Sequence, residues 1–278
     1  LYGSIIHSFS TAGTGGFANH NSSVAYYDSA YIDGVITVFM ILFGINFNMY
    51  FLLLIKDVKS VWKNEEVRAY LGIIVAATLV ITCNVLSIYK EPLKAFRYSI
   101  FQVASIITTT GFATADFNLW PELSKCILLL IMVIGACAGS TGGGVKVSRF
   151  LILWKSILKQ VKGMLHPKSV NVVKVNGKKI SNETLQGVYA YFSAYVFVFG
   201  ISVLLVALDN FDFATTISGV LTTLSNVGPG ISRVGPIENF QSFSVLSKIV
   251  FSMDMLIGRL EIFPFLMICS PSFWRKHF

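Results

Sequence analysis

Charged residues are scarce in this sequence. Asp, Glu, Lys and Arg make up 13% of its 278 residues, whereas 54% are hydrophobic and the mean hydropathy is +0.67. Soluble globular domains carry roughly a quarter charged residues, so the composition excludes that class and favours a membrane-embedded protein. The net charge of +8 does not require a nucleic-acid partner, because basic residues between long apolar runs are typical of cytoplasmic membrane flanks.

Cysteine and histidine are also few. The four cysteines lie in or beside apolar runs without C-x-x-C or Cys/His ligand spacing, so neither a disulfide framework nor a zinc site is predicted. The four histidines have no nucleophile partner or ligand spacing, so we predict that the protein is not an enzyme and carries no covalently bound cofactor. Residue 1 is Leu rather than Met, and we expect a longer protein upstream of it.

Several stretches are long enough to cross a bilayer as a helix, which takes roughly 20 apolar residues. They lie at about 31–55, 69–89, 119–158, 186–208 and 244–268. The third is longer than one crossing needs and contains the glycine-rich segment 135–144. We therefore expect two half-helices around a break there. Asn46 and Asn48, inside the first stretch, are expected to hydrogen bond across helices.

Basic residues indicate the orientation of these spans, because short cytoplasmic loops are enriched in Lys and Arg. The segment 146–179 contains no Asp or Glu and nine basic residues: Lys146, Arg149, Lys155, Lys159, Lys162, Lys168, Lys174, Lys178 and Lys179. It is predicted to be cytoplasmic. Counting crossings places the basic 56–68 loop and the Arg275-Lys276 tail on the same side. Basic residues on merely solvated faces would not explain this alternation.

The regions left outside, 1–30, 90–118 and 209–243, share a pattern. Each has an apolar stretch too short to span, followed by a Thr/Ser/Gly cluster, which favours a re-entrant segment. The clusters align on Gly16, Gly111 and Gly228, spaced by 95 and 117 residues. The sequence thus predicts an internal repeat of helix, re-entrant half-helix, glycine turn and helix.

The chemistry of such a turn follows from its place in the bilayer. Irregular backbone at membrane depth must be buried in protein or line a water-filled path, and carbonyl oxygens of an extended loop can replace the hydration shell of a cation. Glycine allows the required backbone conformations, and the C-terminal end of the half-helix adds partial negative charge. A single turn of this kind would be ordinary; three in register predict a K⁺ filter formed by backbone carbonyls. Its residues are Thr14, Gly15, Gly16, Thr109, Thr110, Gly111, Asn226, Val227 and Gly228.

Several motifs together resemble a known family. They are T-G-G-F at 14–17, T-T-T-G-F at 108–112, S-N-V-G-P-G at 225–230, A-G-S-T-G-G-G-V-K-V at 138–147 and L-I-G-R-L-E at 256–261. The chain resembles the second, third and fourth pore repeats of the Trk/Ktr/HKT superfamily of potassium transporters, and is most similar to TrkH/TrkG-type membrane subunits. The resemblance implies an all-α membrane protein with M1-P-M2 units around a pseudo-fourfold pore. It also implies a homodimer, a TrkA-like cytoplasmic nucleotide-binding regulatory subunit and a bacterial plasma (inner) membrane.

The resemblance also divides the chain. We expect the second pore repeat at 1–60, the third at 61–160, a cytoplasmic basic linker at 161–185, and the fourth repeat with the C-terminal tail at 186–278. The first repeat is not in this sequence and is expected upstream, since three turns cannot surround an ion.

The segment from Gly135 to Gly144 is expected to be a loop, because five glycines in ten residues each disfavour helix by about 1 kcal/mol relative to Ala. The resemblance implies a gate formed by Gly135, Gly139, Ser140, Thr141, Gly142, Gly143 and Gly144. A nucleotide-binding P-loop does not fit, because Val145 stands where its Lys would be and an apolar span precedes it.

Arg259 lies within the last apolar stretch, where an isolated charge costs at least ~2.5–3.5 kcal/mol. It pairs with Glu261 or Asp254, or reaches the pore below the filter, or does both, and the resemblance implies the pore role. The leading functional hypothesis is a gated potassium pore. The alternative is a K⁺ secondary transporter coupled to H⁺ or Na⁺, which needs ionisable residues near the midplane. For the basic 155–179 segment, anionic lipid head groups and a regulatory protein both remain open.

Overall fold

The computed structural model describes residues 1–166, 171–270 and 274. Lys168 and the Arg275-Lys276 tail, which the charge pattern places in the cytoplasm, lie outside these residues. Within them the regular structure is helical apart from one antiparallel hairpin of strands β1 (Lys174–Val175) and β2 (Lys178–Lys179). The predicted all-α class is therefore confirmed.

The helices follow the predicted repeat. The first unit comprises α1 (Tyr2–Ala12), η1 (Ser23–Tyr27), α2 (Ala30–Phe43) and α3 (Phe47–Leu54), and α4 (Val58–Lys63) leads out of it. The second comprises α5 (Glu65–Tyr89), α6 (Pro92–Ile107), η2 (Phe117–Leu119), α7 (Glu122–Ile134) and α8 (Val147–Leu165). The third comprises α9 (Asn182–Val206), η3 (Ala207–Asp209), α10 (Phe213–Ser225), η4 (Ser232–Val234), η5 (Phe240–Ser242), α11 (Val245–Leu260) and α12 (Ile262–Cys269).

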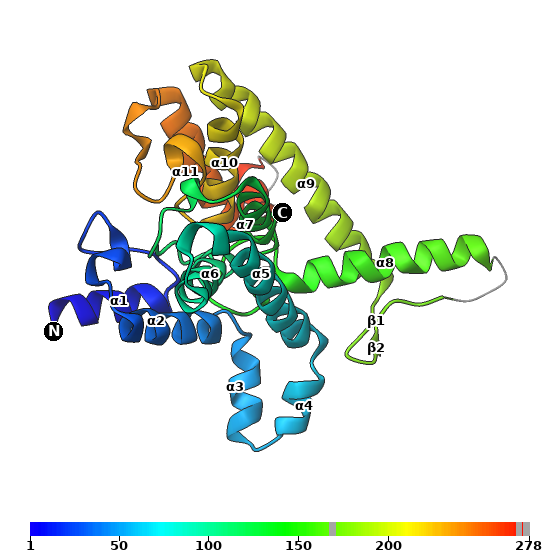
Figure 1. Cartoon of the computed structure of the whole chain (residues 1–278). Helices are drawn as coiled ribbons and strands as arrows, with labels where there is room; N and C mark the ends of the chain where they lie inside the picture. Colours follow the sequence, from blue (N-terminus) through cyan, green and yellow to red (C-terminus); the bar gives the residue numbers. More distant parts are fainter. Residues whose placement is uncertain (167–170, 271–273, 275–278) are drawn as a thin grey trace.

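The short helix α6 lies at the centre of the molecule, between α1–α2 and α10–α11 (Figure 1). Every residue from 101 to 110 is buried, and Ile106 and Ile107 pack in one cluster with Ile81 of α5 and Leu128 of α7. The buried core is therefore built around a re-entrant helix. Long apolar side chains stay exposed on the outer helices, as with Phe197 of α9 at 73%, which suits a surface facing lipid.

Side-chain caps fix where several helices begin. Asn64 Oδ1 accepts hydrogen bonds from the backbone N–H groups of Glu66 and Val67 at the start of α5. Ser181, Asp212 and Ser244 cap α9, α10 and α11 in the same way. Such caps satisfy N–H groups that have no partner inside the helix. The starts of α5, α9, α10 and α11 are thus set by residues that the sequence specifies.

Helices α5 and α9 are long and apolar enough to span a membrane, and α2 with α3 reaches that length as a pair bent by 92°. The sequence predicted one helix over 31–55, but the structure has a break at Gly44-Ile45-Asn46. Asn46 does not bond across helices as predicted, because its Oδ1 accepts from the N–H of Asn48 and caps α3. The interrupted third stretch agrees with its prediction, since α7 and α8 are separated by residues 135–146.

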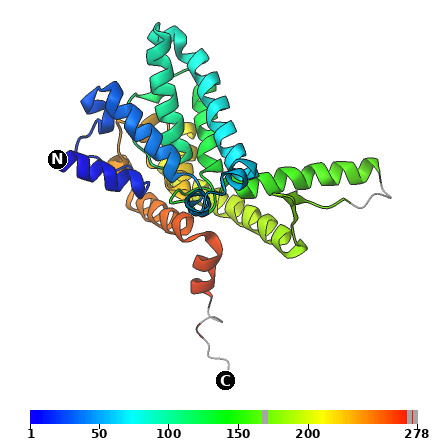
Figure 2. The same cartoon turned by 90° about the horizontal axis from the view of Figure 1, so that it is seen from below.

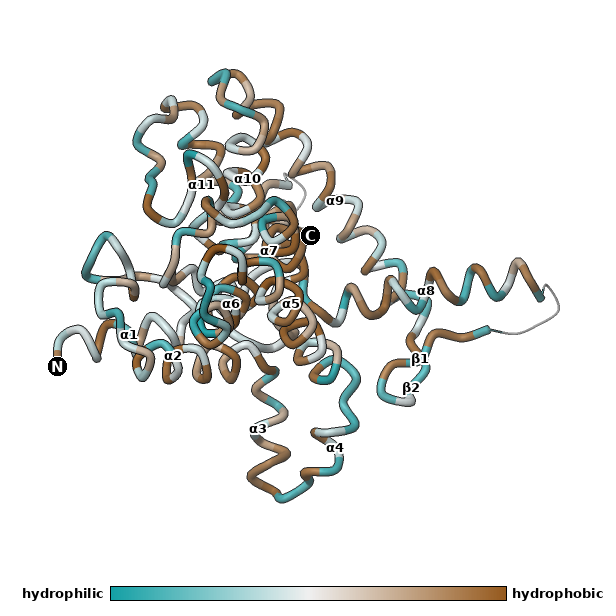
Figure 3. Tube along the Cα trace, viewed as in Figure 1, coloured by the Kyte–Doolittle hydropathy of each residue, from teal (hydrophilic) through white to brown (hydrophobic). Residues whose placement is uncertain are grey.

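The α3–α4 hairpin projects from the central bundle, as does α8 with the β1–β2 hairpin (Figure 1), and α12 extends from it in another direction (Figure 2). Hydrophilic residues gather on α4 and the strands, while α5, α7 and α9 are mostly hydrophobic beyond their polar first turns (Figure 3). Hydrogen bonds from Ser60 hold the pKa of Asp57, the cap of α4, below its ordinary value. Lys155 of α8 pairs with Glu65 and donates to the carbonyl of Lys174. The two basic regions predicted to share the cytoplasmic side therefore meet.

Candidate functional site

Helices α1, α6 and α10 end in turns with the same hydrogen bonds. The N–H groups of Gly15, Thr110 and Val227 donate to the carbonyls of Ser10, Ser105 and Thr222 at 2.7, 2.9 and 2.9 Å. One residue earlier, Thr14, Thr109 and Asn226 donate to Thr11, Ile106 and Thr223 at 3.2, 3.1 and 3.1 Å. The alignment of the three turns predicted from the sequence is therefore confirmed by their matching backbone hydrogen bonds.

Each turn contains two residues whose backbone lies in the left-handed region of positive φ. Thr14, Thr109 and Asn226 have φ of 51°, 57° and 57°, and Gly16, Gly111 and Gly228 have φ of 69°, 86° and 108°. Two left-handed residues separated by one residue reverse the chain direction after a helix, and a β-carbon is disfavoured in this region. The cost at Thr14 and Thr109 shows that the shape of the turn is imposed by its surroundings.

Consecutive turns lie against one another. A β-carbon added to Gly16 would overlap the carbonyl oxygen of Thr110, and one added to Gly111 would overlap that of Val227. Thr110 directly precedes Gly111, and Val227 directly precedes Gly228. Each of the first two turns therefore contacts the next one at the same position. At Gly228 no heavy atom among the described residues, apart from its chain neighbours, lies within 4 Å of that position. The nine predicted filter residues are thus brought together as an arc with one open flank.

Sequence reasoning missed the hydroxyl residue six places before each glycine. Ser105 Oγ donates to the carbonyl of Phe112 at 2.6 Å. Thr222 Oγ1 donates to the carbonyl of Pro229 at 3.2 Å and accepts from the N–H of Gly228 at 2.9 Å. Ser10 holds the same position in the first turn. The signal was present in the aligned repeats, as Ser, Ser and Thr at a fixed spacing.

The glycine-rich segment 135–144, predicted as the gate, forms a loop directly against the filter turns. Thr109 Oγ1 accepts a hydrogen bond from the N–H of Gly143 at 2.5 Å, and Thr14 Oγ1 donates to the carbonyl of Thr141 at 2.9 Å. A β-carbon on Gly143 would lie 2.5 Å from the carbonyl oxygen of Ser225. Only a glycine backbone fits this closely under the turns.

The start of the loop interlocks with the bend between α2 and α3. The N–H of Cys137 donates to the carbonyl of Gly44 at 3.0 Å, and the N–H of Phe47 donates to the carbonyl of Gly139 at 3.1 Å. The hydropathy pattern did not reveal this bend. Its backbone nevertheless holds the start of the loop through these two hydrogen bonds. Gly135, Gly139, Ser140, Gly142 and Gly144 all lie within this seated segment.

Among the residues that the structure describes, Arg259 is bound to the loop and not to an acid. Its Nη1 donates to the carbonyl of Thr141 at 3.0 Å, the same oxygen that Thr14 binds. Glu261 instead pairs with Arg149 at 2.5 Å, and Asp254 accepts from Ser202 at 2.7 Å. Of the two roles left open by the sequence, the acid pairing is wrong. The guanidinium lies on the loop, at a carbonyl that a side chain of the first turn also binds.

Glu66 is a second residue that sequence reasoning missed. Its Oε1 accepts a hydrogen bond from the N–H of Ala138 in the loop at 2.6 Å, and the side chain is buried. Lys146 also holds the loop, through the carbonyl of Gly142. An acid at the first turn of a span looks like an ordinary helix-start residue, so its sequence position gave no signal of this contact.

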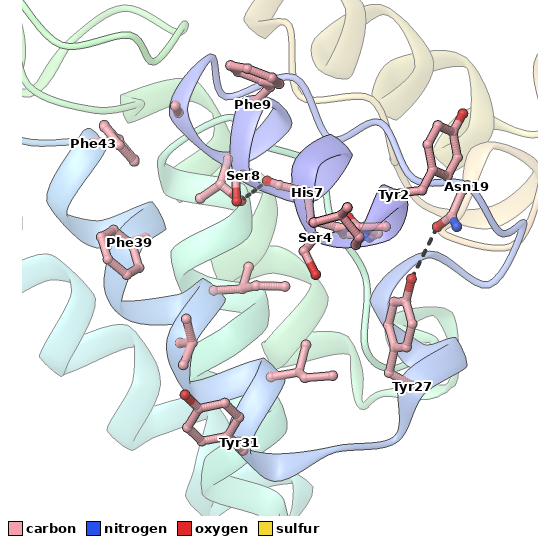
Figure 4. Close-up of a pocket in the computed structure, with 17 residues that line it drawn as sticks. Tyr2, Ser4, His7, Ser8, Phe9, Asn19, Tyr27, Tyr31, Phe39 and Phe43 are labelled. Atoms are coloured by element: carbon pink, nitrogen blue, oxygen red, sulfur yellow. Dashed lines mark hydrogen bonds between the residues drawn. The ribbon is translucent and has the colours of Figure 1, made fainter.

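A cavity of about 850 Å³ lies away from these groups, between α1 and α2 (Figure 4). Its lining is mainly aromatic and aliphatic and includes Phe9, Tyr31 and Phe39. His7 Nδ1 is hydrogen bonded to the carbonyl of Gly3 at 2.7 Å. An apolar lining suits hydrocarbon rather than a cation.

Comparisons with known proteins agree with this geometry. A TrkH protein from Salmonella typhimurium, named a Trk system potassium uptake protein, is 38% identical over 280 residues, and one from Escherichia coli K12 is 36% identical. Both alignments cover 99% of this chain, which spans 57% of the length of these curated relatives. The crystal structure of the potassium transporter TrkH from Vibrio parahaemolyticus superimposes with a TM-score of 0.89 at 37% identity, covering 99% of this chain and 59% of that one. The family model of the TrkH cation transport proteins matches residues 1–276, and the chain belongs to this family.

Proposed function

We propose that this chain forms most of the ion path of a membrane subunit that takes up K⁺ across a bacterial plasma membrane as part of a Trk-type system. The observation that carries the proposal is the arc of three turns with the same backbone hydrogen bonds, in which the first turn packs on a carbonyl of the second and the second on a carbonyl of the third. Backbone carbonyls held at fixed spacing are the ligands that select K⁺ in membrane pores. K⁺ is here the transported ion, and the protein acts as a transporter rather than an enzyme.

The open flank at Gly228 supports a fourth turn supplied by a first repeat upstream of Leu1. In that fourth turn, the carbonyl of the residue before the filter glycine would lie against Gly228. The carbonyls of Thr110 and Val227 lie against Gly16 and Gly111 in the same way. Four turns related in this way enclose an ion, whereas three leave it open on one side.

The loop at 135–144 acts as the gate in this proposal. It is hydrogen bonded to Thr14 and Thr109 of the filter turns and carries the Arg259 guanidinium on the Thr141 carbonyl. A cation leaving the filter would meet packed backbone and a positive charge. Conduction therefore requires the loop to move aside.

A passive gated pore is favoured over coupled transport. The candidates for a coupling site are dispersed: Asp254 is bound to Ser202, Glu261 to Arg149, and Arg259 to the loop. A coupled transporter would bring ionisable groups together at the substrate. The same flux experiment tests both proposals.

Three kinds of partner complete the proposal. A second copy of the subunit would form a homodimer, and a TrkA-like nucleotide-binding regulatory protein would bind on the cytoplasmic side. Membrane lipid would cover the outer helices, whose apolar side chains are exposed.

The test is ion flux into liposomes that contain the full-length protein. We expect K⁺ uptake down its own gradient, much slower Na⁺ uptake, and no dependence on a pH gradient or on added Na⁺. Uptake that requires a proton or Na⁺ gradient would replace the pore with the coupled transporter. Equal K⁺ and Na⁺ fluxes would overturn the selective filter.

A further inference from the structure

Glu66 binds the gate loop near its start. Its carboxylate accepts the N–H of Ala138 at 2.6 Å, three residues after Gly135, the C-cap of α7. Ser148, in the first turn of α8 after the loop, lies close enough to the same carboxylate to favour its charged form. One side chain from a third helix therefore fixes the start of the loop and faces the helix that follows it.

The position of this carboxylate is itself fixed. The N–H of Glu66 donates to the Asn64 cap at 2.9 Å, and the side chain is only 7% exposed. The N-terminal ends of α5 and α8 both present partial positive charge to it. Hydrogen bonds from N–H groups to a charged acceptor are stronger than neutral ones. The carboxylate is thus an anchor and not an incidental contact.

The neighbouring residue Glu65 connects this anchor to the cytoplasmic hairpin. Glu65 pairs with Lys155 of α8, its Oε1 accepts the N–H of Asn176 at 3.2 Å, and its own N–H donates to Asn176 Oδ1 at 2.7 Å. Asn176 lies in the turn between β1 and β2. One helical turn therefore contacts the gate loop through Glu66 and the hairpin through Glu65.

We infer that Glu66 is a positioning residue that latches the gate loop closed, and that Glu65 couples this latch to the β1–β2 hairpin. The inference rests on the gating role proposed above for residues 135–144. A regulatory protein that moves the hairpin would act on the first turn of α5, and the loop would lose its anchor. Release would open the pore below the filter without altering the turns.

Cys137 provides a readout that does not depend on transport. This free thiol is buried beside Ala138 and becomes accessible when the loop leaves its seat. In full-length protein in which every other cysteine is replaced by Ser, the rate of Cys137 modification by a water-soluble methanethiosulfonate is measured in liposomes. K⁺ and Na⁺ fluxes are measured on the same preparations and expressed per folded molecule.

We expect Glu66→Ala to raise the Cys137 modification rate roughly tenfold, because it removes hydrogen bonds to a charged group. K⁺ flux should rise severalfold with an unchanged K⁺/Na⁺ ratio, and Glu66→Gln should lie between this variant and the wild type. A carboxylate acting only by its charge predicts the opposite sign, since removing a negative charge near a cation path slows cations. The matched control is Glu183→Ala, an exposed acid in the first turn of α9, which should change neither measurement.

Ser148→Ala keeps the test decisive if Glu66→Ala does not fold, because it removes a hydroxyl close to the Glu66 carboxylate at the other end of the loop. Wild-type modification rates in folded Glu66→Gln and Ser148→Ala would overturn the latch. Glu65→Gln should raise the modification rate by a smaller factor than Glu66→Ala, and no change would overturn the coupling to the hairpin. If the wild type carries no K⁺, the proposed function fails, while the Cys137 measurement still decides whether Glu66 holds the loop.

Discussion

A side chain introduced by substitution would meet different surroundings at Gly111 and at Gly187. At Gly111 the backbone is left-handed with φ of 86°, and a β-carbon would overlap the carbonyl of Val227. Gly187 lies inside α9 with open space around it. The same chemical change therefore separates the geometry of the filter from the general effect of losing a glycine.

Gly111→Ala is expected to lower K⁺/Na⁺ discrimination of the full-length protein severalfold. A left-handed non-glycine residue costs of order 1–3 kcal/mol, and the Val227 carbonyl must move as well. Selectivity is measured as the ratio of the two fluxes in liposomes, with Gly187→Ala as the control that should keep the wild-type ratio. Retained selectivity in Gly111→Ala would remove the turn from the filter.

Arg259→Gln is expected to speed K⁺ flux without loss of folded protein. A unit charge about 8 Å from the ion opposes it by roughly 2 kcal/mol at an effective dielectric constant near 20. Because Arg259 is bound to the Thr141 carbonyl and not to an acid, no carboxylate is left unpaired. Flux per folded molecule and thermal stability are measured together.

Arg149→Gln is the matched variant for this prediction. It removes a guanidinium that pairs with Glu261 and lies 3.9 Å from the Tyr191 ring centre. Thermal stability should therefore fall. Slower flux with lower stability in Arg259→Gln would show that this side chain, too, is structural.

Residue spacing predicted the three turns, which we propose form the filter, but not the groups that brace them. The glycines, Thr109 and Asn226 were found because a helix followed by a left-handed turn leaves a repeating pattern of small residues. Glu66 could not be found in this way, since its partners Ala138 and Ser148 are 72 and 82 positions away in the sequence. Such contacts depend on how α5 packs against the loop, which no local pattern records.

Helices α2 and α3 show the limit of hydropathy at the scale of elements. A window of twenty residues averages over Gly44 and Asn46, so 31–55 reads as one span although the pair is bent by 92°. The break at 135–146 was predicted because five glycines are a strong local signal. At the bend the signal was one glycine and an Asn that caps the next helix.

Deleting Ser140, Thr141 and Gly142 from the loop is expected to raise basal K⁺ flux severalfold. The deletion removes the carbonyl bound by both Thr14 and Arg259 and the carbonyl bound by Lys146, while the hydrogen bonds within the turns remain. Fluxes of K⁺ and Na⁺ into liposomes are compared with the wild type. A folded deletion variant that conducts no faster would show that the loop is packing and not a barrier.

The arrangement of the whole chain predicts which residues face each side of the membrane. The contact of Glu65 with Lys155 and Asn176 groups the 56–68 and 146–179 regions on one side, which the basic residues identify as cytoplasmic. Asn239, beside η5 in the region after α10, belongs to the opposite side. In intact cells a membrane-impermeant maleimide should modify Asn239→Cys and leave Lys178→Cys unmodified, and the reverse pattern would invert the topology.

The contacts between consecutive turns have a consequence for combined variants. Because Gly16 lies on Thr110 and Gly111 lies on Val227, a displacement of one turn is passed to the next through backbone atoms in direct contact. Residues in contact give interaction energies of about 0.5–3 kcal/mol in double-mutant cycles. The three turns therefore respond together rather than as independent ligands. A second substitution in an adjacent turn should cost less than the first, since the first has already displaced its neighbour.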